Sequence, residues 1–142
     1  MPLRWRDARA MSQENVDRTA DFIAAYNRRD FDAAVELFHP EVEWVLPALQ
    51  ASDSCTGRDE VIRFWDGLDE TFEDLRLLPQ EYVDAGDLVL VRLRHYGKGK
   101  GSGIVIDEEM YHQVTTFRDG IMVRLEYFTT WDQALAAAGV RQ

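Results

Sequence analysis

The spacing of hydrophobic residues divides this chain into a helical first half and a second half made of strands. From residue 73 on, apolar and polar side chains alternate between short turn signals, which predicts four consecutive strands. The predicted strands span 75–84, 87–96, 104–118 and 121–130. The turns between them are expected at Ala85-Gly86, Gly97–Gly103 and Asp119-Gly120. Strands that follow one another without intervening helices favour an α+β fold with an antiparallel sheet.

The first half predicts helices around one strand. Ser12 can cap a first helix, whose apolar stripe is Val16, Thr19, Ala20, Ile23 and Tyr26. Asp30 can cap a short second helix, which His39-Pro40 should end because the residue before a proline resists the helical conformation. Residues 41–46 then alternate, so one face of a half-buried strand carries Val42, Trp44 and Leu46.

Two further helices have capping signals. Thr56-x-x-Asp59 resembles a capping box that opens a third helix, with Val61, Trp65, Leu68 and Phe72 on its buried face. Thr130-x-x-Gln133 can cap a short last helix, and Gly139 should end it. The whole pattern predicts N-terminal helices packed on a strongly curved antiparallel sheet, a conical barrel with a short C-terminal helix.

Length and composition predict one domain. The chain has 142 residues, of which 46% are hydrophobic, enough for one core. We assign residues 11–142 to the domain and residues 1–10 to an extension expected to be disordered, and either Met1 or Met11 can be the natural start. Residues 1–10 lack the apolar stretch of a signal peptide, and no apolar run reaches the roughly 18 residues that span a bilayer.

The net charge and the cysteine content indicate which classes of partner and which cellular compartment are favoured. The formal net charge is −10, which disfavours nucleic acid and membrane surfaces as partners because both are anionic. Cys55 is the single cysteine, so no intramolecular disulfide can form. These features favour a cytoplasmic protein.

Strand alternation predicts which side chains face the inside of the sheet. In 121–130, Arg124 and Glu126 should face outward and Val123, Leu125 and Tyr127 inward. By the same rule, Val91, Leu93 and His95 face inward in the strand 87–96, and Arg92 and Arg94 face outward.

Which residues of the predicted strand 104–118 face inward depends on the lengths of the two turns that flank it. Pairing Tyr96 with Ile104 turns the odd-numbered residues inward, from Asp107 to Phe117. A three-residue loop, Arg118-Asp119-Gly120, keeps this parity, whereas a two-residue Asp-Gly turn conflicts with it. In that register Gln113 lies opposite Leu125 and Tyr111 opposite Tyr127.

The inward residues predict an apolar, aromatic-walled pocket. Its expected lining is Phe22, Tyr26, Trp44, Leu46, Trp65, Tyr111, Gln113, Thr115, Leu125 and Tyr127. The alternative is that the same residues form a filled core. A strongly curved sheet capped by helices is hard to fill, which favours a ligand cavity. Gln113 can orient a ligand carbonyl or hydroxyl, or instead satisfy a buried polar neighbour.

Few residues in the sequence are candidates for acid–base catalysis or for binding a metal or cofactor. His95, Asp107 and Glu109 are the candidate acid–base cluster, because a carboxylate near a histidine can orient a general base. The alternative places them in water at the open end of the sheet. The histidines have no i,i+4 partner, so no metal site is expected, and no cofactor motif appears. The glycine-rich stretch 97–103 joins two strands, which predicts a flexible hairpin loop rather than a phosphate loop.

The outer face of the sheet is predicted to be mixed and partly apolar. Its expected residues are His112, Val114, Thr116, Met122, Arg124, Glu126 and Phe128. Such a face suits a homodimer interface.

Five segments in this order resemble SnoaL-like proteins of the nuclear transport factor 2-like superfamily. The segments are FIAAYNRRDFDAAVELFHPEVEW (22–44), GRDEVIRFW (57–65), VDAGDLVLVRLR (83–94), TTFRDG (115–120) and WDQALAAAGV (131–140). The resemblance covers about residues 11–140. It implies a conical α+β barrel, a pocket between sheet and helices, and frequent homodimers through the outer sheet face.

Ketosteroid isomerases share the fold that this resemblance implies. Their oxyanion tyrosine falls on Phe22, their general-base aspartate on Leu46, and their second oxyanion acid on Gln113. The two supporting tyrosines fall on Phe38 and Trp65. An enolising isomerase needs a base and donors for the enolate oxygen, which phenylalanine and leucine cannot supply. This chemistry is therefore not expected here.

Three hypotheses about function follow. In the first, the protein binds a small hydrophobic molecule in its pocket. In the second, it is an isomerase, cyclase, dehydratase or hydrolase for a hydrophobic oxygenated metabolite such as a polyketide or terpenoid, with His95, Asp107 or Glu109 as acid or base. In the third, it is a structural or interaction module with a filled core, which requires an internal volume below roughly 100 Å³.

Overall fold

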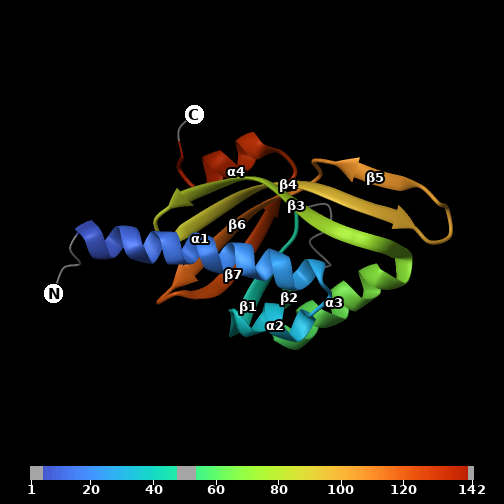
Figure 1. Cartoon of the computed structure of the whole chain (residues 1–142), viewed down its shortest axis with the longest axis horizontal. Helices are drawn as coiled ribbons and strands as arrows, with labels where there is room; N and C mark the ends of the chain where they lie inside the picture. The colour runs from blue at the N-terminus through green and yellow to red at the C-terminus, as the bar shows by residue number, and fades with distance from the viewer. Residues whose placement is uncertain (1–4, 48–53, 141–142) are drawn as a thin grey trace.

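The computed structural model describes residues 5–47 and 54–140, and within these ranges the chain forms four helices and a seven-stranded sheet (Figure 1). In chain order the elements are α1 (Trp5–Asn27), α2 (Phe31–Glu36), β1 (Phe38–Val45), β2 (Cys55–Thr56), α3 (Arg58–Thr71), β3 (Phe72–Ala85), β4 (Leu88–Gly99), β5 (Val105–Glu108), β6 (His112–Arg118), β7 (Ile121–Phe128) and α4 (Trp131–Ala137). The predicted α+β class is confirmed. None of the helices in these ranges has the apolar length that would cross a bilayer.

The sheet runs in the order β2-β1-β7-β6-β4-β3, and β5 pairs with the far part of β4. All pairings are antiparallel except that of β1 with β7, which is parallel. In Figure 1, α1 crosses in front of the strands, and α4 lies at the top of the view. The buried residues form two clusters: the main one includes residues of α1, α2 and α3, and the second includes Ala134 and Leu135 of α4.

The main core lies between the inner face of the sheet and the first three helices. Its centre is Trp65 of α3, which is 1% exposed and packs against the ring of Tyr26 at 5.2 Å and the ring of Trp44 at 5.5 Å between centroids. Inward residues Val89, Val91 and Leu93 of β4 are fully buried beneath these rings. The alternation predicted for β4 is confirmed.

Two of the four predicted helix caps are present in the structure. The Asp30 side chain accepts a hydrogen bond from the Ala33 backbone N–H, and the Thr130 side chain accepts one from the Gln133 N–H. Gly139 has a φ of 71°, which lets the chain leave α4 in the left-handed conformation. The caps predicted for α2 and α4 are therefore confirmed.

The other two caps are wrong. The first helix already begins at Trp5, so Ser12 lies inside it; residues 1–4 of the predicted extension lie outside the described residues. Gly57, not Thr56, is the N-cap of α3, and no side chain caps it, because Thr56 pairs with Glu43 in the sheet. Thr56 therefore takes part in strand pairing and does not cap the helix.

The predicted strand 104–118 is broken in two. His95 pairs with Glu108, whereas Val91 pairs with Gln113. Five steps along the second strand (108 to 113) thus match four steps along β4 (95 to 91), so the segment 109–111 contains one extra residue. Because of the extra residue, the odd-numbered residues of β5 lie on the opposite side of the sheet from the odd-numbered residues of β6. The predicted inward orientation of Asp107 is therefore wrong.

The last hairpin also differs from the prediction. Arg118 pairs with Ile121, so the turn has two residues, Asp119 and Gly120, both with positive φ (52° and 76°). That conformation matches the right-handed twist of the flanking strands. A bulge at Val123 follows, because Phe117 pairs with Met122 and Thr116 with Arg124.

The bulge restores the odd-to-odd pairing, and together with the shorter turn it shifts the predicted register by two residues. Gln113 lies opposite Tyr127, not Leu125 as predicted. Met122, predicted on the outer face, instead belongs to the main core and is fully buried. His112 does lie on the outer face, but α4 covers it and leaves it 3% exposed, with its ring 5.6 Å from that of Trp131.

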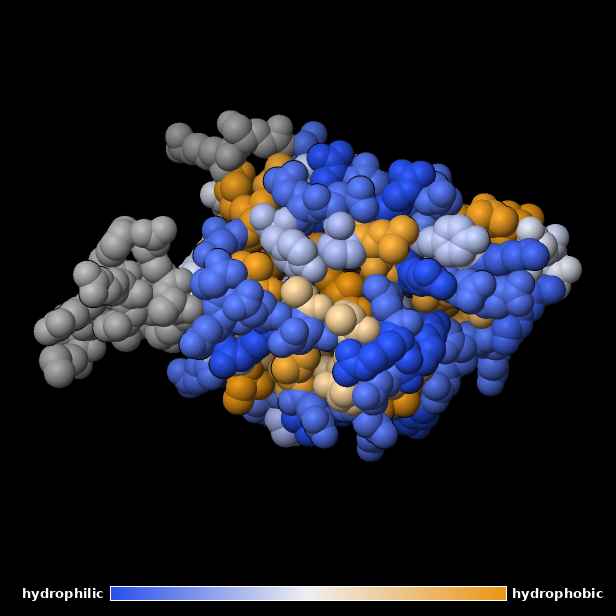
Figure 2. Space-filling model, in the orientation of Figure 1, coloured by the Kyte–Doolittle hydropathy of each residue, from blue (hydrophilic) through white to orange (hydrophobic). Residues whose placement is uncertain are grey.

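The α1 side of the molecule is mostly hydrophilic, with hydrophobic atoms gathered over the start of β5 (Figure 2). Ile104 and Val105 are 66% and 55% exposed there. Ile106, the next residue, lines the internal cavity described below. The β4–β5 hairpin therefore joins an exposed apolar tip to the cavity wall.

Candidate functional site

A cavity of about 280 Å³ lies between α1, α3 and the end of the sheet where β5 pairs with β4. Its walls are mostly aromatic and aliphatic. The lining residues are Tyr26, Trp44, Leu46, Phe64, Trp65, Leu68, Phe72, Leu75, Arg76, Leu77, His95, Tyr96, Ile106, Met110, Tyr111 and Tyr127. This volume exceeds the limit below which the domain would be a filled core.

Six of the ten residues expected to line a pocket lie in this wall. They are Tyr26, Trp44, Leu46, Trp65, Tyr111 and Tyr127. The other four, Phe22, Gln113, Thr115 and Leu125, are fully buried and do not line it. Phe22 packs its ring against Phe38 and Trp65 at 5.3 and 6.0 Å, so it belongs to the core behind the cavity.

Sequence reasoning missed the part of the wall that β3 and the β5 region contribute. Leu75 and Leu77 lie on β3, which the alternation pattern indicated as a strand without assigning its inner face. Ile106 and Met110 were not expected inside, because the prediction carried a single alternation through residues 104–118 without the extra residue between β5 and β6. The even-numbered apolar residues Ile104, Ile106 and Met110 were the signal that could have indicated it.

A buried polar chain runs behind the cavity. The Tyr127 hydroxyl donates to Gln113 Oε1 at 2.8 Å, and Gln113 Nε2 donates to Thr115 Oγ1 at 2.8 Å. Burial raises the pKa of Tyr127 well above its ordinary value, so its hydroxyl keeps its proton at neutral pH. Gln113 thus forms hydrogen bonds with two buried neighbours, which is one of the two roles predicted for this amide.

Three buried nitrogen atoms of cavity-lining residues have no hydrogen-bond partner. They are Trp44 Nε1, Trp65 Nε1 and His95 Nδ1, and among the described residues they are the only buried side-chain N or O atoms without one. All three belong to residues that line the same cavity. Buried polar atoms in folded proteins are nearly always paired, so three unpaired nitrogens among the residues of one cavity are unusual.

His95 is the lining histidine, on β4, with its ring edge-on to Tyr111 at 5.6 Å. Burial and, to a smaller extent, the neighbouring His112 lower the pKa of His95 to about 4. The imidazole is therefore neutral at pH 7. A neutral imidazole offers one donor and one acceptor nitrogen.

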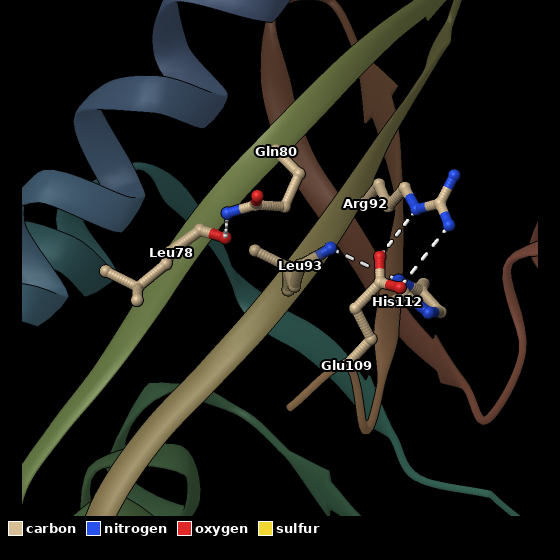
Figure 3. A network of polar contacts seen from close by, with 6 residues as sticks. All are labelled: Leu78, Gln80, Arg92, Leu93, Glu109 and His112. Atoms are coloured by element: carbon tan, nitrogen blue, oxygen red, sulfur yellow. Dashed lines mark hydrogen bonds and ion pairs between the residues drawn. The ribbon is translucent and has the colours of Figure 1, made fainter. Parts of the chain in front are cut away.

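The predicted cluster of His95, Asp107 and Glu109 does not form. Asp107 pairs with Arg94 at 2.6 Å on the outer face. Glu109 pairs with Arg92 at 2.5 Å on the same face (Figure 3). His112, also on that face, accepts a hydrogen bond from the Leu93 N–H through Nδ1. The cause is the extra residue in 109–111, which turns the two carboxylates away from His95.

The cavity wall is poorly equipped for proton abstraction. Its lining includes no aspartate or glutamate. Leu46, which the resemblance aligns with the isomerase base, lies in the wall, and Phe22, which it aligns with the oxyanion tyrosine, is fully buried. No group of three His, Cys, Asp or Glu residues that could hold a metal ion occurs in the described ranges. The arrangement suits the binding of an apolar ring with a few hydrogen bonds.

Comparison with solved structures shows the same fold in several bacterial proteins. An NTF2-like protein of unknown function from Burkholderia pseudomallei K96243 superimposes with a TM-score of 0.74 at 21% identity, over 87% of this chain and 95% of that one. TerC, co-crystallized with polyporic acid, has a TM-score of 0.73 at 22% identity, over 89% and 98% of the two chains. An NTF2-like protein from Burkholderia thailandensis E264 has a TM-score of 0.70 at 25% identity, over 89% and 98%.

Comparison with curated proteins gave no match. The SnoaL-like domain family matches residues 19–125, which include α2, α3, β1 to β6, the last part of α1 and most of β7. The predicted resemblance is thereby confirmed, and the chain belongs to the SnoaL-like domain family.

Proposed function

We propose that this protein binds a small, mostly apolar, ring-containing molecule in the cavity. The observation that carries the proposal is a partly open cavity of about 280 Å³ lined mainly by aromatic and aliphatic side chains. A cavity of about 150 Å³ lined by apolar side chains takes up benzene, so this one has room for about two fused rings. It lies near the lower limit of typical small-molecule sites.

The composition of the wall supports binding through ring contacts. Trp44 and Tyr127 lie 4.7 Å apart between centroids, and Phe64 lies 6.3 Å from Trp44, so a flat ligand meets several π faces at once. TerC, which has the same fold, was co-crystallized with polyporic acid. A small organic ligand in this fold is thus consistent with a known structure.

Catalysis on a hydrophobic oxygenated metabolite, such as a polyketide or terpenoid, is the second candidate. It is favoured by one observation, the presence of His95 in the wall with an unpartnered Nδ1. With a pKa of about 4, His95 is a weak base at pH 7. Binding is therefore better supported than acid–base catalysis.

A cavity-filling variant tests the proposal. Leu68→Trp places a larger ring in the wall, and we expect it to abolish binding of 2-naphthol measured by isothermal titration calorimetry. Leu78→Trp is the matched control, because Leu78 is half-buried but does not line the cavity. Equal affinity for 2-naphthol in both variants, or no binding by the unsubstituted protein, would refute the proposed site.

Two finer parts of this proposal concern assembly and location. We propose a homodimer through the outer sheet face, at the part that α4 leaves uncovered around Thr116 and Arg124. Sedimentation of the purified protein tests this, and a monomer at micromolar concentration would refute it.

The single cysteine supports a reducing, cytoplasmic location, which cell fractionation tests.

A further inference from the structure

We propose that the ligand of this cavity is a neutral carbonyl compound whose oxygen accepts a hydrogen bond from the Trp44 indole, with His95 as the second polar contact. This inference rests on the proposed binding function and names the ligand class. It follows from which polar atoms of the wall lack a partner and from the charges that the wall does not contain.

The unpartnered atoms are concentrated in one place. Trp44 Nε1, Trp65 Nε1 and His95 Nδ1 are the buried polar side-chain atoms without a partner in the described part of the chain, and each belongs to a cavity-lining residue. Leaving a buried donor unpaired costs about 1–3 kcal/mol. A ligand that pairs with such an atom recovers this cost on binding, so the wall selects for ligands that carry the complementary group.

Trp44 decides what that group is. An indole N–H can only donate, so its partner must be an acceptor. Trp44 is 5% exposed and lies between Tyr127, Phe64 and Trp65. A ligand ring that packs on these side chains brings an attached carbonyl oxygen close to the indole. Because Nε1 is itself buried, binding requires a small turn of the Trp44 ring.

Trp65 contributes less to recognition. It is 1% exposed, and its ring is surrounded by Phe22, Tyr26, Phe31 and Phe38 in addition to Trp44. An indole N–H that faces a neighbouring ring gains a weak N–H···π contact. The inference therefore depends on Trp44 and His95.

The charges around the cavity favour a neutral ligand. No carboxylate lines the wall to pair with a cation. His95 is neutral at pH 7, so it does not attract an anion. Arg76 is the one charged residue in the lining, and because its side chain is exposed, water screens its charge. A charged group deeper in the cavity, beside Trp44 and His95, would lose its hydration without a buried counter-charge.

The experiment compares α-tetralone with tetralin, which has the same two-ring skeleton without the carbonyl. Nitrogen-15 spectra of the full chain report on its four tryptophan indole N–H groups. We expect α-tetralone to bind about tenfold more tightly than tetralin, a ratio that one well-made buried hydrogen bond supplies. We also expect it to move the Trp44 indole signal strongly downfield and to leave the Trp131 signal in place.

Variants separate the hydrogen bond from ring packing. Trp44→Phe keeps an aromatic ring but removes the donor, so the preference for α-tetralone should vanish: α-tetralone should lose about tenfold more affinity than tetralin, which loses ring contact alone. His95→Phe should reduce the preference partially. Trp131→Phe, on the outer face, is the matched control and should change neither affinity.

Each outcome has one meaning. Equal affinities of the unsubstituted protein for the two compounds, or an unmoved Trp44 signal with α-tetralone bound, would overturn the carbonyl inference and leave the binding proposal standing. Failure of both compounds to bind would overturn the proposed function as well. The spectrum of the unsubstituted protein keeps the test decisive if Trp44→Phe fails to fold.

Discussion

Glu109 forms a two-point ion pair with Arg92 on the outer face of the sheet, with Arg92 Nε 2.5 Å from Oε1 and Nη2 3.3 Å from Oε2 (Figure 3). The hydrogen bond from Arg92 holds the pKa of Glu109 below its ordinary value. Because this carboxylate lies outside the cavity, it cannot act on a ligand there.

Glu109→Gln is therefore expected to leave the affinity for a two-ring ligand unchanged. Its effect on stability should be small and should disappear at high salt, because exposed ion pairs are weak and are screened. Calorimetric titration and urea unfolding check both statements. A clear loss of binding in Glu109→Gln, with His95→Phe as the comparison, would restore the acid–base cluster.

The chain from Tyr127 through Gln113 to Thr115 predicts a second result. Gln113→Leu removes the partner of the buried Tyr127 hydroxyl, and we expect it to lower the free energy of unfolding by about 3 kcal/mol. Tyr127→Phe removes the hydroxyl itself. The double variant should cost less than the sum of the two single changes, by about 1 kcal/mol, in urea unfolding. Strict additivity would show that the hydrogen bond does not couple the two residues.

The pH dependence of stability should reflect His95. Its pKa is about 4 in the folded protein and 6.5 when unperturbed, so the unfolded chain takes up the proton first as the pH falls. The stabilising contribution is complete above pH 6.5 and is lost as the pH falls toward 4, by about 3 kcal/mol in total. His112, whose pKa burial also lowers, adds a loss of the same sign.

His95→Phe should flatten this curve. The measurement is the free energy of unfolding in urea at several pH values between 7 and 4.5. An equally steep loss of stability in the His95→Phe variant would mean that other groups cause the acid sensitivity.

Met122 tests the bulge in β7. Because the bulge turns this side chain into the core, where it is fully buried, Met122→Ala should destabilise the fold by about 2–4 kcal/mol. Its neighbour Ile121 is 43% exposed, and Ile121→Ala should cost less than about 1 kcal/mol. Thermal and urea unfolding of the two variants compare them directly. Similar losses for both would contradict the bulge.

Much of the fold could be predicted because its signals are local. The alternation of Val89, Val91 and Leu93 indicated a strand and its buried face, and the caps at Asp30 and Thr130 indicated where two helices begin. These patterns depend on neighbouring residues in one element, and the physics of a pleated strand or a helix end acts at that range.

Only the tertiary structure decided how the strands align. The extra residue between β5 and β6 and the bulge at Val123 each shift a strand by one position. The position of such a shift is fixed by pairing with a strand that is distant in the sequence. Those two shifts moved Asp107 and Glu109 away from His95 and placed Gln113 opposite Tyr127. The sequence alone determined that this chain builds an aromatic-walled α+β domain, whereas long-range strand pairing decided which polar groups reach its cavity.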